Sequence, residues 1–115
     1  MNITLPWPPS VNTYYRTYKN RTILSETARR YKKAACLAIA TIIKTPPMYT
    51  GRLEVELHLA PPDRRRRDID NYGKATLDAL QAAGIFKDDG QIDRLFFYRL
   101  DITTDPHVIA IITTI

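Results

Sequence analysis

Residues 52–60 carry the pattern that most constrains the fold. Apolar and polar side chains alternate strictly over this stretch, which is typical of a β-strand with one buried face. Pro61 and Pro62 end the strand, because proline supplies no donor to a β-ladder. A charged run follows, and then a helical pattern extends from near Asp70 to Gly84, a residue suited to the position just after a helix. The sequence therefore predicts a strand joined to a helix by a charged segment.

The amino-terminal part predicts a strand and a hairpin. Residues 3–7 have the pattern of a short strand, and two prolines stop it. Residues 12–24 alternate aromatic and basic side chains around Lys19 and Asn20. This pattern favours a small hairpin that presents basic side chains, Arg16 among them.

A long helix and two further strands complete the expected elements. Ser25 is a suitable N-cap, and apolar residues then recur at helical spacing until Pro46. Residues 92–102 and 108–115 are rich in β-branched and aromatic side chains, as strands are. We expect these two strands to pair with each other across a turn at residues 104–106.

The order of these elements indicates the fold class. It reads strand, hairpin, helix, strand, helix, strand, strand, without an internal repeat or a linker. Hydrophobic residues make up 44% of the chain, enough for a globular core. We expect a single compact α/β (α+β) domain over residues 1–115, with a mixed sheet packed against two main helices.

The composition of the chain indicates which binding partners and which cellular compartment to expect. Lys and Arg outnumber Asp and Glu by 17 to 12, a net charge of +5 that favours polyanionic partners. The single cysteine, Cys36, excludes an intrachain disulfide and lies in an apolar stretch typical of a buried thiol. No segment has the apolar length of a membrane span, and the first residues lack the pattern of a signal peptide. We expect a cytoplasmic protein without a membrane partner.

The charged run between strand and helix carries the candidate chemistry. Asp68 and Asp70 project to the same side of an extended backbone, where two like charges repel. A hard divalent cation such as Mg²⁺ would offset that repulsion. A second acidic pair, Asp88 and Asp89, follows the helix and can return toward the first, so three carboxylates could converge.

Each of these residues also has an ordinary structural interpretation. Asp68 or Asp70 could simply cap the second helix. Lys74 lies on the same helix face, where an ammonium could stabilise charge on a phosphate, but an ion pair with Asp70 or Asp78 would equally account for it. Spacing alone leaves both interpretations open.

Other catalytic schemes find little support. The chain has only two histidines, His58 and His107, and one cysteine, so a zinc site or a Cys-His nucleophile is not indicated. The chain has no glycine-rich phosphate loop, and we expect no organic cofactor.

Taken together, these motifs resemble the RusA family of Holliday junction resolvases over most of the chain. The stretches that carry the resemblance are ITLPWPPS at residues 3–10, Asn12, YYR at 14–16, PDRRRRDIDN at 62–71, Lys74, DAL at 78–80 and the acidic pair at 88–89. The resemblance implies a RusA-like fold and a Mg²⁺-dependent homodimer, with Mn²⁺ as a possible substitute, that nicks two opposed strands of a four-way DNA junction.

The resemblance also assigns roles to individual residues. It implies that Asp68, Asp70 and Asp89 hold the metal and that Lys74 assists catalysis. The expected DNA contacts are Arg16, Arg64, Arg65, Arg66, Arg67 and Asn71. Gly73 is not a residue that helices favour, because glycine inside a helix costs on the order of 1 kcal/mol relative to alanine. Two alternatives stay open: a non-catalytic module for branched DNA, and a nuclease for another DNA branch.

Overall fold

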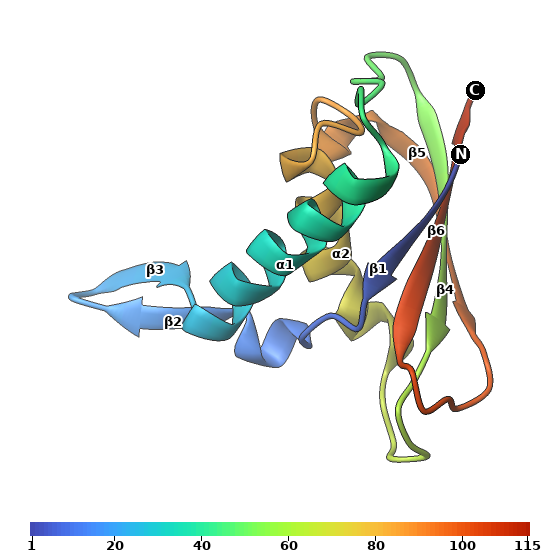
Figure 1. Cartoon of the computed structure of the whole chain (residues 1–115). Coiled ribbons are helices and arrows are strands. Elements are labelled where there is room, and N and C mark those ends of the chain that lie inside the picture. The colour runs from blue at the N-terminus through green and yellow to red at the C-terminus, as the bar shows by residue number, and fades with distance from the viewer.

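The computed structural model describes residues 1–115 and places both helices on one side of a four-stranded mixed sheet (Figure 1). The strands, in order across the sheet, are β1 (Asn2–Pro6), β6 (His107–Thr114), β4 (Leu53–Ala60) and β5 (Ile92–Arg99). The helices are α1 (Glu26–Ile42) and α2 (Gly73–Ala82). The expected fold class, a mixed sheet against two main helices, is confirmed.

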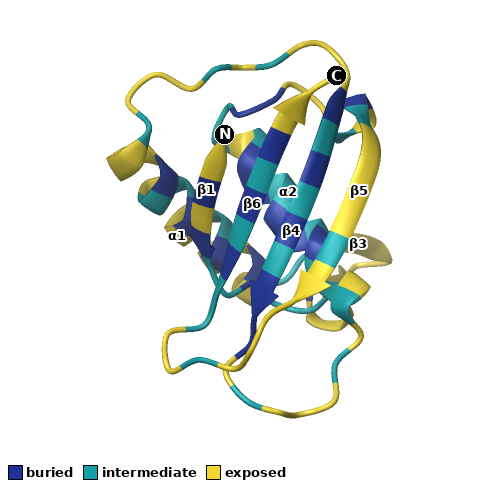
Figure 2. Cartoon of the chain, turned by 90° about the vertical axis from the view of Figure 1, so that its right-hand side faces the viewer, coloured by how far each residue is buried: buried dark blue, intermediate teal, exposed yellow.

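β4 is a central strand, as its alternation predicts. Its apolar residues, from Leu53 to Leu59, are fully buried, and the polar residues between them are half-buried. The buried face joins one hydrophobic core with side chains of both helices, including Ile39 and Leu80. The opposite face of the sheet carries no helix (Figure 2). Truncating one of these leucines to alanine costs about 2–5 kcal/mol, so this layer dominates the stability.

Helix α1 begins and ends where the sequence predicts. The Ser25 hydroxyl accepts a hydrogen bond from the backbone N–H of Ala28 at 3.1 Å, as an N-cap does. The helix ends at Ile42, shortly before Pro46. Its core-facing side places Tyr31 and Ile39 against the sheet, while basic residues occupy its exposed side.

The predicted pairing of the last two strands is wrong. β5 lies parallel to β4, and β6 lies antiparallel on the other side of β4, so the two are not neighbours. The connection after β5 crosses the end of β4, where the N–H of Leu100 donates to the carbonyl of Leu59 and that of Thr103 to Pro61. Returning through α2 sets β5 beside β4 as a parallel strand, and its other side is left as a sheet edge.

The predicted hairpin is confirmed as β2 (Tyr15–Tyr18) and β3 (Arg21–Leu24). Lys19 and Asn20 at its turn have φ values of 50° and 61°, the left-handed conformation that a tight two-residue hairpin turn requires. The hairpin projects away from the sheet beside the start of α1 (Figure 1).

The second helix starts later than the sequence predicts. A short 3-10 turn, η2 (Ile69–Tyr72), precedes α2, which begins at Gly73. A Cβ at Gly73 would lie 2.8 Å from the ring of Phe97 on β5, so this close contact requires glycine. Gly84 follows the helix with a φ of 82°, as predicted. No helix of the chain has the length and hydropathy needed to cross a membrane.

Candidate active site and nucleic-acid interface

The first two predicted carboxylates flank the start of η2. Asp68 is extended, with φ −85° and ψ 117°, and its side chain caps nothing. Asp70 lies in the first turn of η2, and both residues are exposed. Tyr72 occupies the N-cap position of α2 without a side-chain hydrogen bond. The interpretation that Asp68 or Asp70 caps the second helix is therefore wrong.

The third carboxylate lies in the acidic turn after α2, which forms the short turn η3 (Asp89–Gln91). Asp88 caps this turn, and its carboxylate accepts from the N–H of Gly90 at 3.3 Å. The backbone N–H of Asp89 donates to the side-chain oxygen of Gln81 at 3.2 Å. Of the acidic pair, Asp88 has a structural contact and the Asp89 carboxylate does not.

Gln91 fixes the acidic turn to the rest of the chain, a role that the sequence interpretation missed. It is 8% exposed, and its amide donates to the carbonyls of Tyr49 at 2.9 Å and Gly51 at 2.8 Å. Its oxygen accepts from the N–H groups of Lys87 and Asp88. A Gln three residues after an Asp is the pattern of a capping box, so the signal was present.

The predicted metal ligands have no partners within the chain. The carboxylates of Asp68, Asp70 and Asp89 enter no ion pair and accept no hydrogen bond, which is also true of Asp101 and Asp105, whereas Asp93 pairs with Arg52. No group of three Asp, Glu, His or Cys side chains is gathered closely enough to hold a metal ion. The structure does not form the expected three-carboxylate cluster, and the metal-ligand assignment stays a prediction.

Lys74 is held on α2 by an acidic neighbour. Its Nζ lies 3.2 Å from Asp78 Oδ1, the ion pair predicted as its ordinary role, and Asp78 Oδ2 accepts a hydrogen bond from the Tyr14 hydroxyl at 2.5 Å. Partial burial lowers the pKa of Lys74, but the hydrogen bond and charge of Asp78, with Tyr15 and Asp89 contributing, outweigh it and leave the pKa raised. Lys74 is therefore a cation at neutral pH and lies within electrostatic reach of Asp89.

The arginine loop (residues 63–68) is braced from inside by one of its own arginines. The Arg67 side chain is 10% exposed, and its guanidinium pairs with Asp63 at 2.8 Å. It also lies over the ring of Trp7, which packs against Tyr72 with ring centroids 5.0 Å apart. The backbone N–H of Arg65, and then Arg67, lower the pKa of Asp63. Arg67 therefore holds the loop in shape, and a direct contact with DNA stays a prediction.

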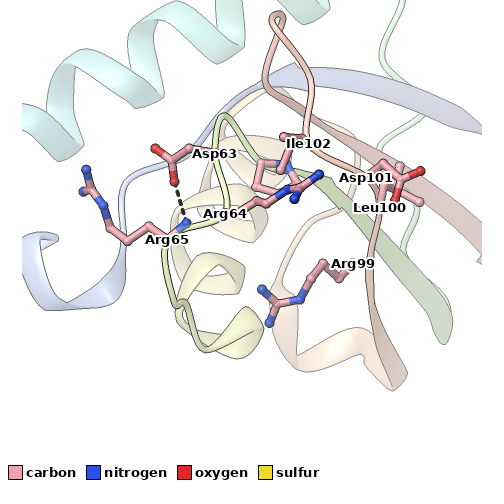
Figure 3. Close-up of a pocket in the computed structure, with 8 residues that line it drawn as sticks. Asp63, Arg64, Arg65, Arg99, Leu100, Asp101 and Ile102 are labelled. Atoms are coloured by element: carbon pink, nitrogen blue, oxygen red, sulfur yellow. Dashed lines mark hydrogen bonds between the residues drawn. The ribbon is translucent and has the colours of Figure 1, made fainter.

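The other loop arginines border two hollows. The larger, about 570 Å³, lies between the loop and the segment after β5, and Figure 3 shows Arg64 reaching into the space between them. Arg99 lines this hollow and donates to the carbonyl of Arg67 at 2.8 Å. Arg99 was missed as a candidate because only the tertiary structure brings the end of β5 beside the arginine loop.

The second hollow adjoins the first carboxylate. Its volume is about 340 Å³, and its lining joins the amino-terminal loop to the start of η2: Ser10, Asn12, Arg66, Arg67, Asp68, Asn71 and Tyr72. Asn71 thus lines the same hollow as Asp68, and its expected contact with DNA stays a prediction. Arg16 lies elsewhere, on the projecting hairpin, with its guanidinium 5.6 Å from the ring centre of Tyr18.

The donor set suits a hard divalent cation. Mg²⁺ binds through one or two carboxylates and completes its shell with water and phosphate oxygens. Fully or partly exposed carboxylates without internal partners provide such ligands at no cost in broken ion pairs. No histidine or cysteine lines the hollow beside Asp68, so the site lacks the ligands that zinc prefers.

This is a small basic α+β domain with unpaired carboxylates, one of them within electrostatic reach of a lysine, and with arginine-lined hollows. These are the features of a polyanion-binding protein with an acidic site. Comparison with known proteins narrows this class. The family described as Endodeoxyribonuclease RusA matches residues 6–113. The chain belongs to the RusA family, and the expectation drawn from its motifs is confirmed.

Several relatives are more than 40% identical to this chain over the aligned residues. The crossover junction endodeoxyribonuclease RusA of Escherichia coli K12 is 44% identical over 96 residues, covering 79% of this chain and 75% of that protein. The protein of the same name from Enterobacteria phage 82 matches equally, and that from Shigella sonnei Ss046 is 43% identical over the same coverage.

Proposed function

We propose that this chain is a crossover junction endodeoxyribonuclease that acts in DNA recombination and repair. As a homodimer it would nick two opposed strands of a four-way DNA junction, with Mg²⁺, or Mn²⁺ in its place, held by Asp68, Asp70 and Asp89. Family membership and the names of its relatives support the reaction. The observation that carries the site assignment is that these three carboxylates are free of internal partners in a chain with a net positive charge.

Different residues of the chain would have different roles in phosphodiester hydrolysis. A bound divalent cation supplies an activated water and neutralises phosphate charge. Lys74, kept cationic and oriented by Asp78, would stabilise the negative charge that develops on the phosphate. Arg64, Arg65 and Arg66 would bind neighbouring phosphates through salt-sensitive contacts.

A homodimer follows from the symmetry of the substrate. One chain holds one set of Asp68, Asp70, Asp89 and Lys74, whereas resolution requires two cuts related by the twofold symmetry of the junction. Two copies related by a twofold axis provide both sites.

The decisive experiment compares DNA shapes. A synthetic four-way junction, a three-way branch and a linear duplex of the same sequence are incubated with the protein and Mg²⁺. We expect paired nicks in the four-way junction only, and no cleavage by Asp70→Asn, with Asp105→Asn as a control on an exposed loop carboxylate. Binding of the junction without any metal-dependent nicking would indicate a non-catalytic module, and preferential cutting of the three-way branch would assign another substrate.

A further inference from the structure

The projecting hairpin of β2 and β3 has two different faces (Figure 1). The strand pairing sets Tyr15 opposite Leu24 on one face, and Leu24 packs against the hydrophobic core. Because side chains alternate along a strand, Arg16, Tyr18 and Arg21 lie together on the other face. All three are exposed, so this outer face is available to a partner.

The outer face gathers unpaired cations around one aromatic ring. Tyr18 is 51% exposed, and the Arg16 guanidinium and the Lys19 ammonium lie 5.6 Å and 5.4 Å from its ring centre. None of the hairpin cations enters an ion pair, and the first carboxylate along the chain is Glu26, after the hairpin. Exposed aromatic rings among cations suit nucleic acid, which offers both phosphates and flat base faces.

The base of the hairpin is fixed beside Lys74. Ser25 closes the hairpin, because its N–H donates to the Tyr14 carbonyl at 2.9 Å and its hydroxyl donates to the Thr13 carbonyl at 2.6 Å. The Tyr14 hydroxyl donates in turn to Asp78, the ion-pair partner of Lys74. The hairpin therefore leaves the domain at the candidate active site, and its direction is set by the same residues.

The length of the hairpin sets its reach along DNA. From Tyr15 to Tyr18 the strand advances by about 10 Å, since each residue adds about 3.3 Å. Phosphates of one DNA strand follow each other at about 3.4 Å along the helix axis. A DNA strand that has its scissile phosphate at Lys74 and runs along the hairpin would meet Tyr18 about three nucleotides away.

We propose that Tyr18 stacks on a base at the branch point of a four-way junction, while Arg16 and Lys19 bind the phosphates beside that base. This proposal rests on the proposed function and names a residue that determines which DNA shape is preferred. In a linear duplex the base faces are stacked on one another, and opening them costs free energy. A branch point interrupts this stacking, so a base face is available there to Tyr18.

A plainer role for Tyr18 makes a different prediction. If the ring only holds Arg16 and Lys19 in place, its loss weakens the binding of every DNA alike, because phosphates are present in all of them. If the ring stacks on a base at the branch point, its loss weakens junction binding and hardly affects a linear duplex. The ratio of the two affinities therefore separates the two roles.

The first experiment measures this ratio in EDTA, without metal-dependent hydrolysis. Tyr18→Ala should raise the Kd for a synthetic four-way junction about fivefold or more and leave the Kd for a linear duplex within about twofold. Tyr18→Phe keeps the ring and should bind both DNAs like the wild type. Tyr18 lies outside the hydrophobic core, so both variants should fold. Tyr98→Ala, on a similarly exposed tyrosine that stacks on His58, is the matched control. Equal losses for junction and duplex would overturn the proposal.

Salt dependence distinguishes the ring from its cations. Lys19→Ala should reduce the slope of log junction affinity against log salt by about one, because one phosphate contact is lost. Tyr18→Ala should keep the wild-type slope, since stacking releases no counterion. A slope reduced equally in both variants would show that Tyr18 acts only through the cations, and would overturn the stacking role.

Photocrosslinking tests which base meets Tyr18. The wild-type protein is irradiated in complex with four-way junctions that carry 5-iodouracil either at the branch point or deep within an arm. Mass spectrometry should find the branch-point base attached to Tyr18 and no attachment of the arm base to this residue. Attachment of Tyr18 to the arm base alone, or of the branch-point base to other residues alone, would overturn the proposal.

Nicking by the wild type is recorded in parallel, which separates this proposal from the proposed function. A wild type that nicks junctions, together with a Tyr18→Ala variant that keeps the full preference for junctions over duplex, would overturn the stacking role alone. A junction preference that depends on Tyr18, in a protein that never nicks a junction with Mg²⁺, would overturn the proposed function alone.

Discussion

The Tyr14 hydroxyl donates a 2.5 Å hydrogen bond to Asp78, and the other oxygen of that carboxylate lies 3.2 Å from Lys74 Nζ. Tyr14 is 1% exposed and belongs to the amino-terminal region, whereas Asp78 and Lys74 lie one turn apart on α2. A buried residue far away in sequence therefore holds the carboxylate that pairs with Lys74. This connection makes the amino-terminal region part of the candidate active site.

Tyr14→Phe should affect both stability and cleavage. Removing a hydrogen bond to a charged group costs about 1.5–3 kcal/mol of unfolding free energy, measurable by urea denaturation. We also expect a several-fold slower single-turnover nicking rate with unchanged junction affinity, because Lys74 loses its fixed partner. Tyr31→Phe is the control, since Tyr31 donates to the Pro6 carbonyl and does not contact Lys74. Equal nicking rates for the two variants would show that Tyr14 has only a structural role.

Lys74→Ala should lower the nicking rate by about 10²–10³-fold, as expected for the loss of one charge-stabilising group. The partly exposed i,i+4 ion pair with Asp78 contributes only about 0.3–0.5 kcal/mol, so the melting temperature should hardly change. Lys44→Ala, on an exposed lysine outside the site, serves as the control. Near-normal nicking by Lys74→Ala would favour the plain ion-pair role.

The raised pKa of Lys74 also predicts a pH dependence. A group whose pKa is raised on folding stabilises the protein below its unfolded pKa, about 10.4 for lysine, and this contribution disappears as the pH rises through the folded value. Lys74 thus keeps its charge from pH 7 to 9. A difference in unfolding free energy between wild type and Lys74→Arg that grows steadily from pH 7 to 9 would contradict this charge state.

The arginines of the loop should differ in how they affect DNA binding. Arg66→Ala should reduce the slope of log affinity against log salt by about one, because an exposed arginine releases one counterion on binding. Arg67→Ala should weaken junction binding while changing that slope less, because Arg67 neutralises Asp63 and braces the loop against Trp7. Asp63→Asn should share part of the Arg67→Ala effect. Identical slope changes for both arginine variants would assign Arg67 to a phosphate instead.

Gly73→Ala tests the contact between η2, α2 and β5. Alanine favours a helix by about 1 kcal/mol, but its Cβ would lie 2.8 Å from the Phe97 ring. Overpacking of this kind costs about 1–3 kcal/mol, so we expect a net loss of unfolding free energy. Combining it with Phe97→Leu should recover part of the loss. A stabilised Gly73→Ala single variant would show that helix propensity outweighs the close contact at this position.

The sequence by itself determined the elements and the candidate residues. The alternation over β4, the Ser25 cap and the left-handed Gly84 follow from interactions within a few residues, which a linear pattern records. The arginine run stood in one short stretch with Asp68 and Asp70, and the second acidic pair followed the helix. The family that these motifs indicated is confirmed.

Tertiary structure alone decided what depends on contacts between distant residues. β5 lies beside β4 instead of β6 because the path through α2 returns it there, and strand propensity carries no information about neighbours. The same packing requires glycine at position 73 against Phe97, brings Arg99 to the arginine loop and joins Tyr14 to Asp78. It also gives Asp88 a capping contact and leaves Asp68, Asp70 and Asp89 without partners, because the pairing of a carboxylate depends on the whole fold around it.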